Sequence, residues 1–289
     1  MNPISFLTQM LRIAIPYLFA ASGGVIAERA GIITLSLEGY MLTGAFSATL
    51  GVHYTGSPWI GVLSGVFGGL IFGLIQAVAS IRYRANQVVV GIAINLLAIG
   101  VTRFFLKLAF ASSSNSPRVN GFGGNQAWHG FDNPLVWMGL LVAPLLGWVL
   151  YKTPFGLRVR AVGEHPDAAA SLGIKVSRIQ YLSVALSGML AALGGVFLAL
   201  DQHQFTDQMT AGRGFIAVAA VIFGRWDPVR AALACLLFAA AETLQIQLQG
   251  NQLIPSQFIE MIPYLLTIIA LAGVVGRAVP PAALGKSAE

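Results

Sequence analysis

Apolar segments of bilayer-spanning length follow one another along almost the whole of this chain. A membrane-spanning helix needs about 20 mostly apolar residues. We expect crossings near residues 9–27, 31–52, 58–81, 87–110, 134–151, 178–200, 229–248 and 259–276. Only 10% of the residues are charged, whereas a soluble domain carries roughly a quarter. The sequence therefore predicts an all-α integral membrane protein, with residues 1–289 forming a single membrane domain.

Basic residues exceed acidic ones, 17 against 11. Such an excess can indicate nucleic-acid binding, but no basic patch with interleaved aromatic residues is present. The cations lie between apolar segments, where they anchor short loops on the cytoplasmic side. We therefore expect contact with membrane lipid and no nucleic-acid partner. The single cysteine, Cys235, lies in an apolar segment, and His53, His129, His165 and His203 are scattered without metal-ligand spacing. No metal site is predicted.

A polar loop, residues 153–177, interrupts the apolar pattern and carries the strongest cationic cluster. The positive-inside rule places this loop in the cytoplasm. Residues 112–133 then fall outside. A short apolar piece at 215–223 decides the rest of the topology, because only if it crosses do Arg225, Arg230, Arg277 and Lys286 also lie inside. The charge rule therefore favours about nine crossings, with the N-terminus outside.

The polar loop contains a small helix with its own start and stop. Pro166 suits the first helical position, Asp167 favours the positive N-terminal end, and Gly173 ends the helix. At about 1.5 Å per residue, roughly seven residues give about 10 Å of helix. Such a helix is marginal in water unless it docks against something. It is either a surface elbow between two membrane helices or a docking element.

Two Gly-bounded segments interrupt the apolar pattern at corresponding places in the two halves. Residues 31–39 are polar within an apolar stretch, and residues 212–224 are too short for an ordinary crossing. Paired segments of this kind point to the midplane site of a transporter. The alternative is that these glycines only allow close packing of helices.

A few side chains are candidates for a translocation pathway: Ser36, Glu38 and Phe215 within these segments, Trp226 just after the second, and Asn95 in the apolar run 88–99. A charged residue at the centre of a membrane helix costs about 2.5 to 3.5 kcal/mol. Glu38 therefore either accepts hydrogen bonds from backbone amides at the helix break or faces the pathway. Asn95 contacts a substrate or joins two helices. Phe215 and Trp226 are expected either to stack on a flat ring of the substrate or to be ordinary structural aromatic residues. Glu242 is expected to make a packing or subunit contact rather than to bind a ligand.

The sequence does not indicate an enzyme. No Ser-His-acid arrangement and no pair of carboxylates in one segment suggests a reaction. Gly285-Lys286-Ser287 resembles the end of a phosphate-binding loop, but Pro280 stands where that motif needs a glycine. We therefore expect no cofactor on this chain, and any ATP that drives it must bind another chain.

The run Ala161-Val162-Gly163-Glu164-His165-Pro166-Asp167-Ala168-Ala169, followed by Leu172-Gly173-Ile174, resembles the coupling-helix segment of bacterial ABC importer permeases. That family serves simple sugars, nucleosides and branched-chain amino acids. The resemblance implies that this helix docks into an ATP-binding subunit. It assigns coupling to Gly163, Glu164, His165, Pro166, Asp167, Ala168, Ala169, Leu172 and Gly173.

Two further stretches extend the resemblance to nearly the whole chain. Residues 27–39 are similar to the "ERxGxxNxxxEG" pattern of the nucleoside-type branch, with Thr34 where that branch usually has Asn. Residues 212–228 are similar to its second-half pattern, with Gly224-Arg225-Trp226 where the sugar and amino-acid branches tend to have Gly-Gly.

The resemblance implies a multi-pass permease subunit of the bacterial inner membrane that imports nucleosides. Its partners would be an ATP-binding subunit, a second and usually different permease subunit, and an external substrate-binding protein. The alternatives are a simple-sugar or branched-chain amino acid ABC permease, or an ion-coupled secondary transporter. The last would need several intramembrane acids, and beyond Glu38 and Glu242 the sequence offers few.

Overall fold

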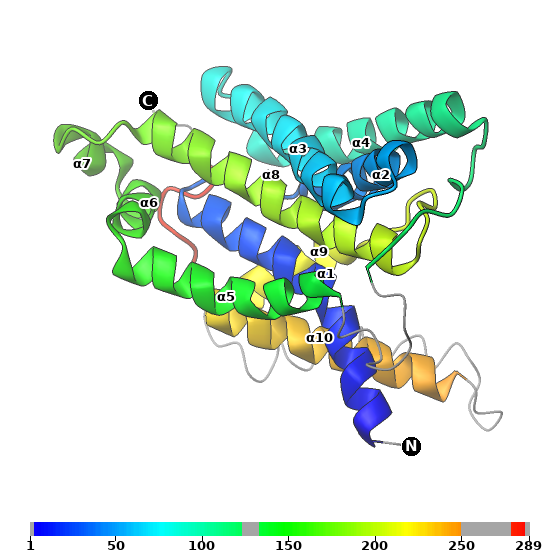
Figure 1. Ribbon diagram of the computed structural model, residues 1–289. Helices are drawn as coiled ribbons and strands as arrows, with labels where there is room; N and C mark the ends of the chain where they lie inside the picture. Colours follow the sequence, from blue (N-terminus) through cyan, green and yellow to red (C-terminus); the bar gives the residue numbers. More distant parts are fainter. Residues whose placement is uncertain (1–2, 123–132, 250–278, 287–289) are drawn as a thin grey trace.

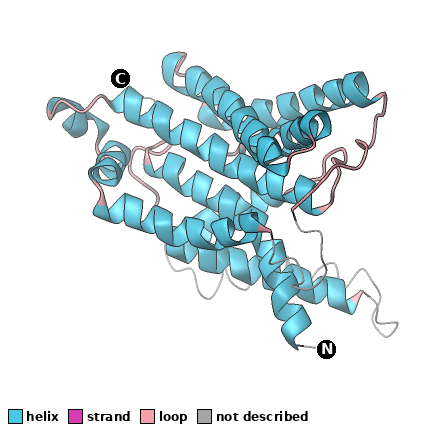
Figure 2. Cartoon of the chain, viewed as in Figure 1, coloured by secondary structure: helices cyan, strands magenta, loops and turns pink. Residues whose placement is uncertain are grey.

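The structure is a computed structural model that describes residues 3–122, 133–249 and 279–286. Within these residues every regular element is a helix, as Figure 2 shows. An isolated β-bridge joins Asn115 to Thr206. The expected all-α architecture is therefore confirmed for the part of the chain that the structure describes.

Six helices among the described residues are long and apolar enough to cross a membrane. They are α1 (Pro3–Arg29), α3 (Pro58–Ala77) with its π-helical continuation η1 (Val78–Arg82), α4 (Gln87–Phe110), α5 (Pro134–Lys152), α8 (Val176–Asp201) and α10 (Pro228–Leu248). Each coincides with a crossing expected from the sequence. The crossing expected at 259–276 lies outside the described residues.

Two other helices differ from simple crossings. The segment expected to cross at 31–52 is divided, because residues 30–36 are not helical and α2 (Leu37–Thr55) begins only after them. α9 (Arg213–Phe223) has 11 residues, which agrees with the short apolar piece in the sequence. α2 is not among the six helices whose composition suits a crossing, and most of its residues are buried. A helix enclosed by protein does not need an apolar outer surface.

The long helices pack around α1 and α8, which run side by side through the bundle (Figure 1). α2 and α3 lie against α8, while α5, α9 and α10 lie against α1. Large apolar side chains on the outer helices are exposed, such as Leu63 on α3, Leu96 on α4 and Trp148 on α5. In a bilayer these faces contact lipid, as the hydrophobic composition requires.

Proline and short polar residues start most of these helices. Pro58, Pro134, Pro154, Pro166 and Pro228 each occupy a first-turn position, where the missing N–H costs no hydrogen bond. Four helices are also capped by a side-chain oxygen that accepts from the first free amides: Asn86 for α4, Asn133 for α5, Thr153 for α6 (Pro154–Glu164) and Asp227 for α10. The helix starts are therefore fixed by local sequence.

The two ends of the bundle differ. The polar loop forms α6 (Pro154–Glu164) and α7 (Pro166–Ser171), which lie beside the last turn of α1 and the start of α8; we call this the α7 end. At the opposite or far end, residues 112–122 pair with residues 203–207, with the Ser116 amide donating to the Phe205 carbonyl at 2.9 Å. This pairing fixes the stretch that leads into α9.

Candidate translocation and coupling sites

The first helix break, residues 30–36, runs through the interior of the bundle between α1 and α2. Non-helical backbone is tolerated at membrane depth only where protein or water satisfies its polar groups. Here buried side-chain amides do so. Gln180 donates to the Ala30 carbonyl (3.4 Å), Gln87 accepts from the Ile33 amide (2.7 Å), Gln76 donates to the Ile33 carbonyl (3.0 Å) and Asn95 donates to the Leu35 carbonyl (2.9 Å).

Glu28, near the end of α1, joins the first break to the turn after α9. Its Oε1 accepts from the Thr34 amide (3.3 Å) and hydroxyl (3.2 Å), and its Oε2 accepts from the Trp226 indole N–H (2.6 Å). Arg29 adds a hydrogen bond from Nε to the Trp226 carbonyl at 2.7 Å. Glu28 is only 4% exposed. The sequence reasoning missed this residue, although a carboxylate at the end of an apolar segment is a signal for a buried partner.

Glu38, in the first turn of α2, binds the start of α9. Its Oε1 accepts from the Thr210 hydroxyl (2.6 Å) and the Gly212 amide (2.8 Å), and its Oε2 accepts from the Gly214 amide (2.6 Å). A carboxylate is well placed there, because a helix N-terminus presents free N–H groups and partial positive charge. Gly214 must lack a side chain, since a methyl group would overlap the Glu38 backbone.

The hydrogen-bonding role considered for Glu38 is thus confirmed, with one difference. Its amide partners belong to the second break and not to the break in which Glu38 itself lies. Asn95 behaves as the interhelical contact weighed in the sequence analysis, because it also accepts from the Gly39 amide at 2.8 Å. Both side chains therefore hold the broken segments in place.

A cavity of about 340 Å³ opens between α2, α4 and the start of α9. Its polar groups come from Glu38, Asn95, Gln208 and Thr210. Its apolar wall consists of Leu42, Ile92, Leu96, Ile99 and Phe215. The volume lies within the range of about 300–1,000 Å³ that small-molecule sites occupy. The mixture suits a ligand that has hydroxyl or amide groups and a flat apolar face.

Three of the five residues expected to line a pathway, Glu38, Asn95 and Phe215, reach this cavity. The other two, Ser36 and Trp226, do not line it. Ser36 is fully buried, and Trp226 is 5% exposed because its indole is held by Glu28 near the α7 end. Gln208 and Thr210 were missed, since the irregular stretch before α9 carries no periodic pattern.

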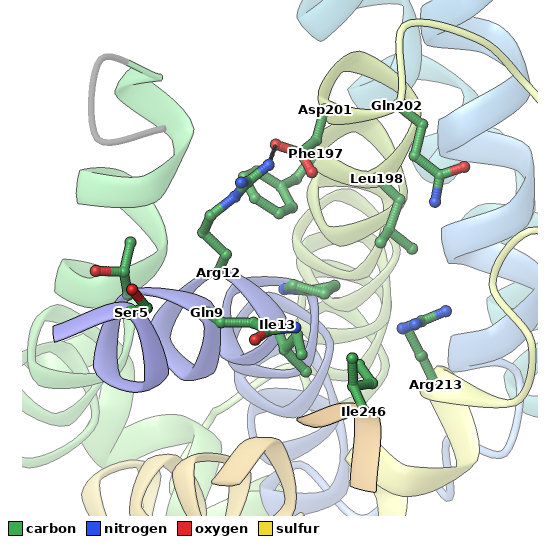
Figure 3. Close-up of a pocket in the computed structure, with 12 residues that line it drawn as sticks. Ser5, Gln9, Arg12, Ile13, Phe197, Leu198, Asp201, Gln202, Arg213 and Ile246 are labelled. Atoms are coloured by element: carbon green, nitrogen blue, oxygen red, sulfur yellow. Dashed lines mark hydrogen bonds and ion pairs between the residues drawn. The ribbon is translucent and has the colours of Figure 1, made fainter. Parts of the chain in front are cut away.

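A second cavity, of about 770 Å³, lies nearer the far end between α1, α8, α9 and α10 (Figure 3). Arg12 pairs with Asp201 across it at 2.7 Å. Arg213 also lines it and pairs at 3.0 Å with Glu242, which accepts a hydrogen bond from Tyr17 as well. Glu242 is therefore a packing contact, as the sequence favoured.

The turn from Gly212 to Gly214 lies between the two cavities. Glu38, which lines the smaller cavity, holds the amides of Gly212 and Gly214. The side chain of Arg213, between them in the sequence, lines the larger cavity. One turn at the start of α9 thus contributes to both sites.

α7 has the local structure that the sequence predicts. It begins at Pro166, and Gly173 adopts a left-handed conformation with φ of +82°. The amides of Gly173 and Ile174 then close the helix end on the carbonyls of Ala170 (2.9 Å) and Ala169 (3.1 Å). The preceding helix α6 was not predicted, although Thr153 and Pro154 provide a cap and a first-turn proline.

The residues expected to couple to an ATPase divide into exposed and buried groups. Exposed side chains are those of Glu164, His165, Asp167, Ala168 and Leu172, and Leu172 is 81% exposed. Gly173 is also exposed and Pro166 is half-buried. Gly163 and Ala169 are buried, because Gly163 packs on the Arg29 carbonyl and Ala169 belongs to the core. Only the first group presents a surface to another chain.

Two interior backbone breaks, each held by side chains from neighbouring helices, define a multi-pass helical membrane protein of the kind that moves solutes. The family described as the branched-chain amino acid transport system / permease component matches residues 6–271. The chain belongs to this family. It is therefore a permease component and not an enzyme.

Known relatives match nearly the full chain. It is 39% identical over 296 residues to the guanosine ABC transporter permease protein NupQ of Bacillus subtilis (strain 168), covering 94% of this chain and 92% of that protein. It is 37% identical over 303 residues to the nucleoside ABC transporter permease protein NupC of Lactococcus lactis subsp. cremoris (strain MG1363), covering 96% and 94%. A second Bacillus subtilis protein, the guanosine permease NupP, is 22% identical over 278 residues, covering 90% and 79%.

A solved structure shares the fold. It shows a metal-chelate type ABC transporter in an inward-facing conformation, with a TM-score of 0.51 and 13% sequence identity. The match covers 92% of this chain and 85% of the other. The arrangement of helices is therefore that of an ABC transporter permease.

Proposed function

We propose that this chain is one transmembrane subunit of an ATP-driven nucleoside importer of the bacterial inner membrane. The observation that carries the proposal is the cavity between the two helix breaks. Glu38, Asn95 and Gln208 offer hydrogen-bonding groups for a sugar or a base edge, and Phe215, 50% exposed, offers a ring face for stacking. The names of the relatives NupQ and NupC point to the same substrate class.

We further propose that residues 1–289 form one membrane domain with about nine crossings, with the α7 end in the cytoplasm. Described residues on either side of the crossing expected at 259–276 support this count. The end of α10 contacts the start of α1 through Gln247 and Gln9, whereas Gly285 bonds to Gly31 beyond the other end of α1. The chain therefore changes ends between them.

Coupling to ATP hydrolysis would take place through α7. Its exposed residues, together with Leu172 directly after its last residue, form the surface that would dock into an ATP-binding subunit. A single α7 can serve one ATPase site, so a complex with two sites needs a second permease. NupP and NupQ, two guanosine permeases of one organism, fit such a pair. An external binding protein would deliver the substrate at the far end, where the larger cavity lies.

The docking role of α7 can be tested by Leu172→Asp, with Leu157→Asp on α6 as the matched control. Leu157 is also exposed, at 61%, but lies near the start of α6, whereas Leu172 directly follows α7. We expect Leu172→Asp to abolish association with the ATP-binding subunit, measured by co-purification, while membrane insertion is unchanged. Equal association of both variants with the ATPase would contradict the docking role.

The substrate and the energy source are tested together by reconstitution into proteoliposomes with both permeases, the ATP-binding subunit and the binding protein. Labelled guanosine, adenosine, ribose and leucine are offered with and without ATP. We expect ATP-dependent uptake of the nucleosides. Uptake of ribose or leucine alone would assign the chain to another branch of the family. Uptake by this chain alone, driven by an ion gradient, would overturn the proposal.

A further inference from the structure

Residues 279–286, which we call the C-terminal strap, lie between two segments that are distant in the sequence. The Ala283 amide donates to the Gly163 carbonyl at 2.9 Å, at the end of α6. The Gly285 amide donates to the Gly31 carbonyl at 3.2 Å, at the start of the first break. In Figure 1 the strap, in red, passes between α6 and the end of α1. The strap thus forms hydrogen bonds both to the polar loop, residues 153–177, and to the first break.

The packing around the strap is close. Gly31 has a φ of +90°, and a methyl group on it would lie 3.3 Å from the Ala283 carbonyl oxygen. Ala283 is 7% exposed. Gly285 has a φ of +78°, and a methyl group there would lie 2.8 Å from Ile33. Such contacts leave little freedom for one segment to move without the other.

A third contact ties the strap to the connection between α6 and α7. The Ala282 amide donates to a carboxylate oxygen of Glu164 at 3.3 Å. Only His165 separates Glu164 from Pro166, the first residue of α7. A displacement of α7 would therefore move Gly163 and Glu164, to which Ala283 and Ala282 of the strap are bonded. Gly285, nearer the end of the strap, bonds to the backbone of Gly31.

We propose that the C-terminal strap is a positioning element that transmits movement of α7 to the first helix break. This inference rests on the proposed function, because it needs an ATP-binding subunit that moves α7. The partners of the strap named above, Gly31, Ile33, Gly163 and Glu164, line neither cavity. Its role is to link the docking helix to the stretch that Glu28, Asn95 and the buried glutamines hold in place.

The test compares Ala283→Leu with Ala282→Leu in the complete reconstituted complex. Ala283 is buried against Gly31, so a larger side chain must displace the strap. Ala282 is exposed, and the control keeps its amide for Glu164. The measured quantity is the number of ATP molecules hydrolysed per guanosine molecule taken up, with co-purification reporting assembly.

We expect Ala283→Leu to raise the ATP consumed per guanosine by about 5-fold or more, the lower range of coupling between distant sites, while Ala282→Leu matches wild type. A purely structural role would lower assembly and leave this ratio unchanged in the complexes that form. If Ala283→Leu does not assemble, Gly285→Ala decides, because its methyl group meets only the tip of Ile33, which can move, while the left-handed φ of +78° still strains the strap.

An unchanged ratio in the assembled variants would overturn the strap proposal. This failure is distinguishable from failure of the proposed function. If wild-type complex takes up no nucleoside, the function is wrong; if wild type transports and the strap variants keep its ratio, only the strap is wrong.

Discussion

The two helix breaks solve the same problem with different side chains. The first is irregular, so its backbone presents both N–H and C=O groups; the amide side chains of Gln76, Gln87, Asn95 and Gln180 satisfy most of them, and Glu28 accepts from the Thr34 amide. The second is the start of a helix, which presents only N–H groups and is satisfied by the Glu38 carboxylate. Amides both donate and accept, whereas carboxylates only accept. The partner thus follows from the backbone conformation of each break.

The two carboxylates that join the breaks also differ. Glu28 is enclosed by Thr34 and Trp226 and lines neither cavity. Glu38 is half-buried and lines the smaller cavity. We therefore expect Glu28 to serve stability and Glu38 to serve transport.

The largest effect should come from adding a methyl group where the second break meets α2. Gly214→Ala would place that group against the Glu38 backbone, and we expect a loss of stability of about 3 kcal/mol. Gly212→Ala is the control, because it has free space and only a left-handed φ of +81°, which costs about 1–2 kcal/mol. Thermal unfolding of the purified complex measures both. Equal losses would show that the contact between α2 and α9 is not tight.

The next effect concerns the enclosed carboxylate. Glu28→Gln would leave one of its buried donors facing an NH₂ group, and we expect a loss of about 2 kcal/mol in stability. Uptake per folded complex should stay at the wild-type level. Trp226→Phe, which removes one donor and keeps the carboxylate, should cost less. A larger loss in uptake than in thermal stability would place Glu28 in the pathway.

A smaller effect is expected for the first break. Asn95→Leu removes the partners of the Gly39 amide and the Leu35 carbonyl, at a cost of about 1–2 kcal/mol. Asn95→Gln keeps an uncharged amide that can both donate and accept, so it should recover part of the stability. Thermal unfolding in nanodiscs checks the order. If the glutamine variant is the less stable one, the hydrogen bonds do not explain the role of Asn95.

The smallest loss of stability is expected when the hydroxyl of Thr210 is removed. Thr210→Val removes one of the hydrogen bonds to Glu38 and leaves the two amides in place, so we expect a loss of about 1 kcal/mol. Uptake should change little, because α9 remains bound. Loss of transport as complete as for a Glu38 variant would mean that the hydroxyl itself contacts substrate.

The sequence predicts those parts of the structure that local chemistry determines. The lengths of the apolar segments locate six long helices, and Pro166 and Gly173 mark the start and the end of α7. It also identifies Glu38 as a hydrogen-bond acceptor at a break. It cannot identify the partners of Glu38, since Thr210 and Gly214 lie more than 170 residues away and no periodic pattern relates them.

Tertiary packing explains the remaining differences. Trp226 was expected in the pathway because an aromatic residue near a break can stack on a ligand, but its buried indole N–H donates a hydrogen bond to Glu28. The helix α6 was read as part of a polar loop because its charged residues obscure its capping residues. The strap is beyond sequence reasoning, because its backbone hydrogen bonds depend on no side-chain type.

The central claim is that Glu38, by joining the two helix breaks beside the cavity, controls transport. The direct measurement is ATP-dependent guanosine uptake by the reconstituted complex that carries Glu38→Gln. Loss of a charged hydrogen-bond acceptor costs about 1.5–3 kcal/mol, so we predict that uptake falls about 10-fold or more while the complex still assembles and hydrolyses ATP. Wild-type uptake by this variant would contradict the account.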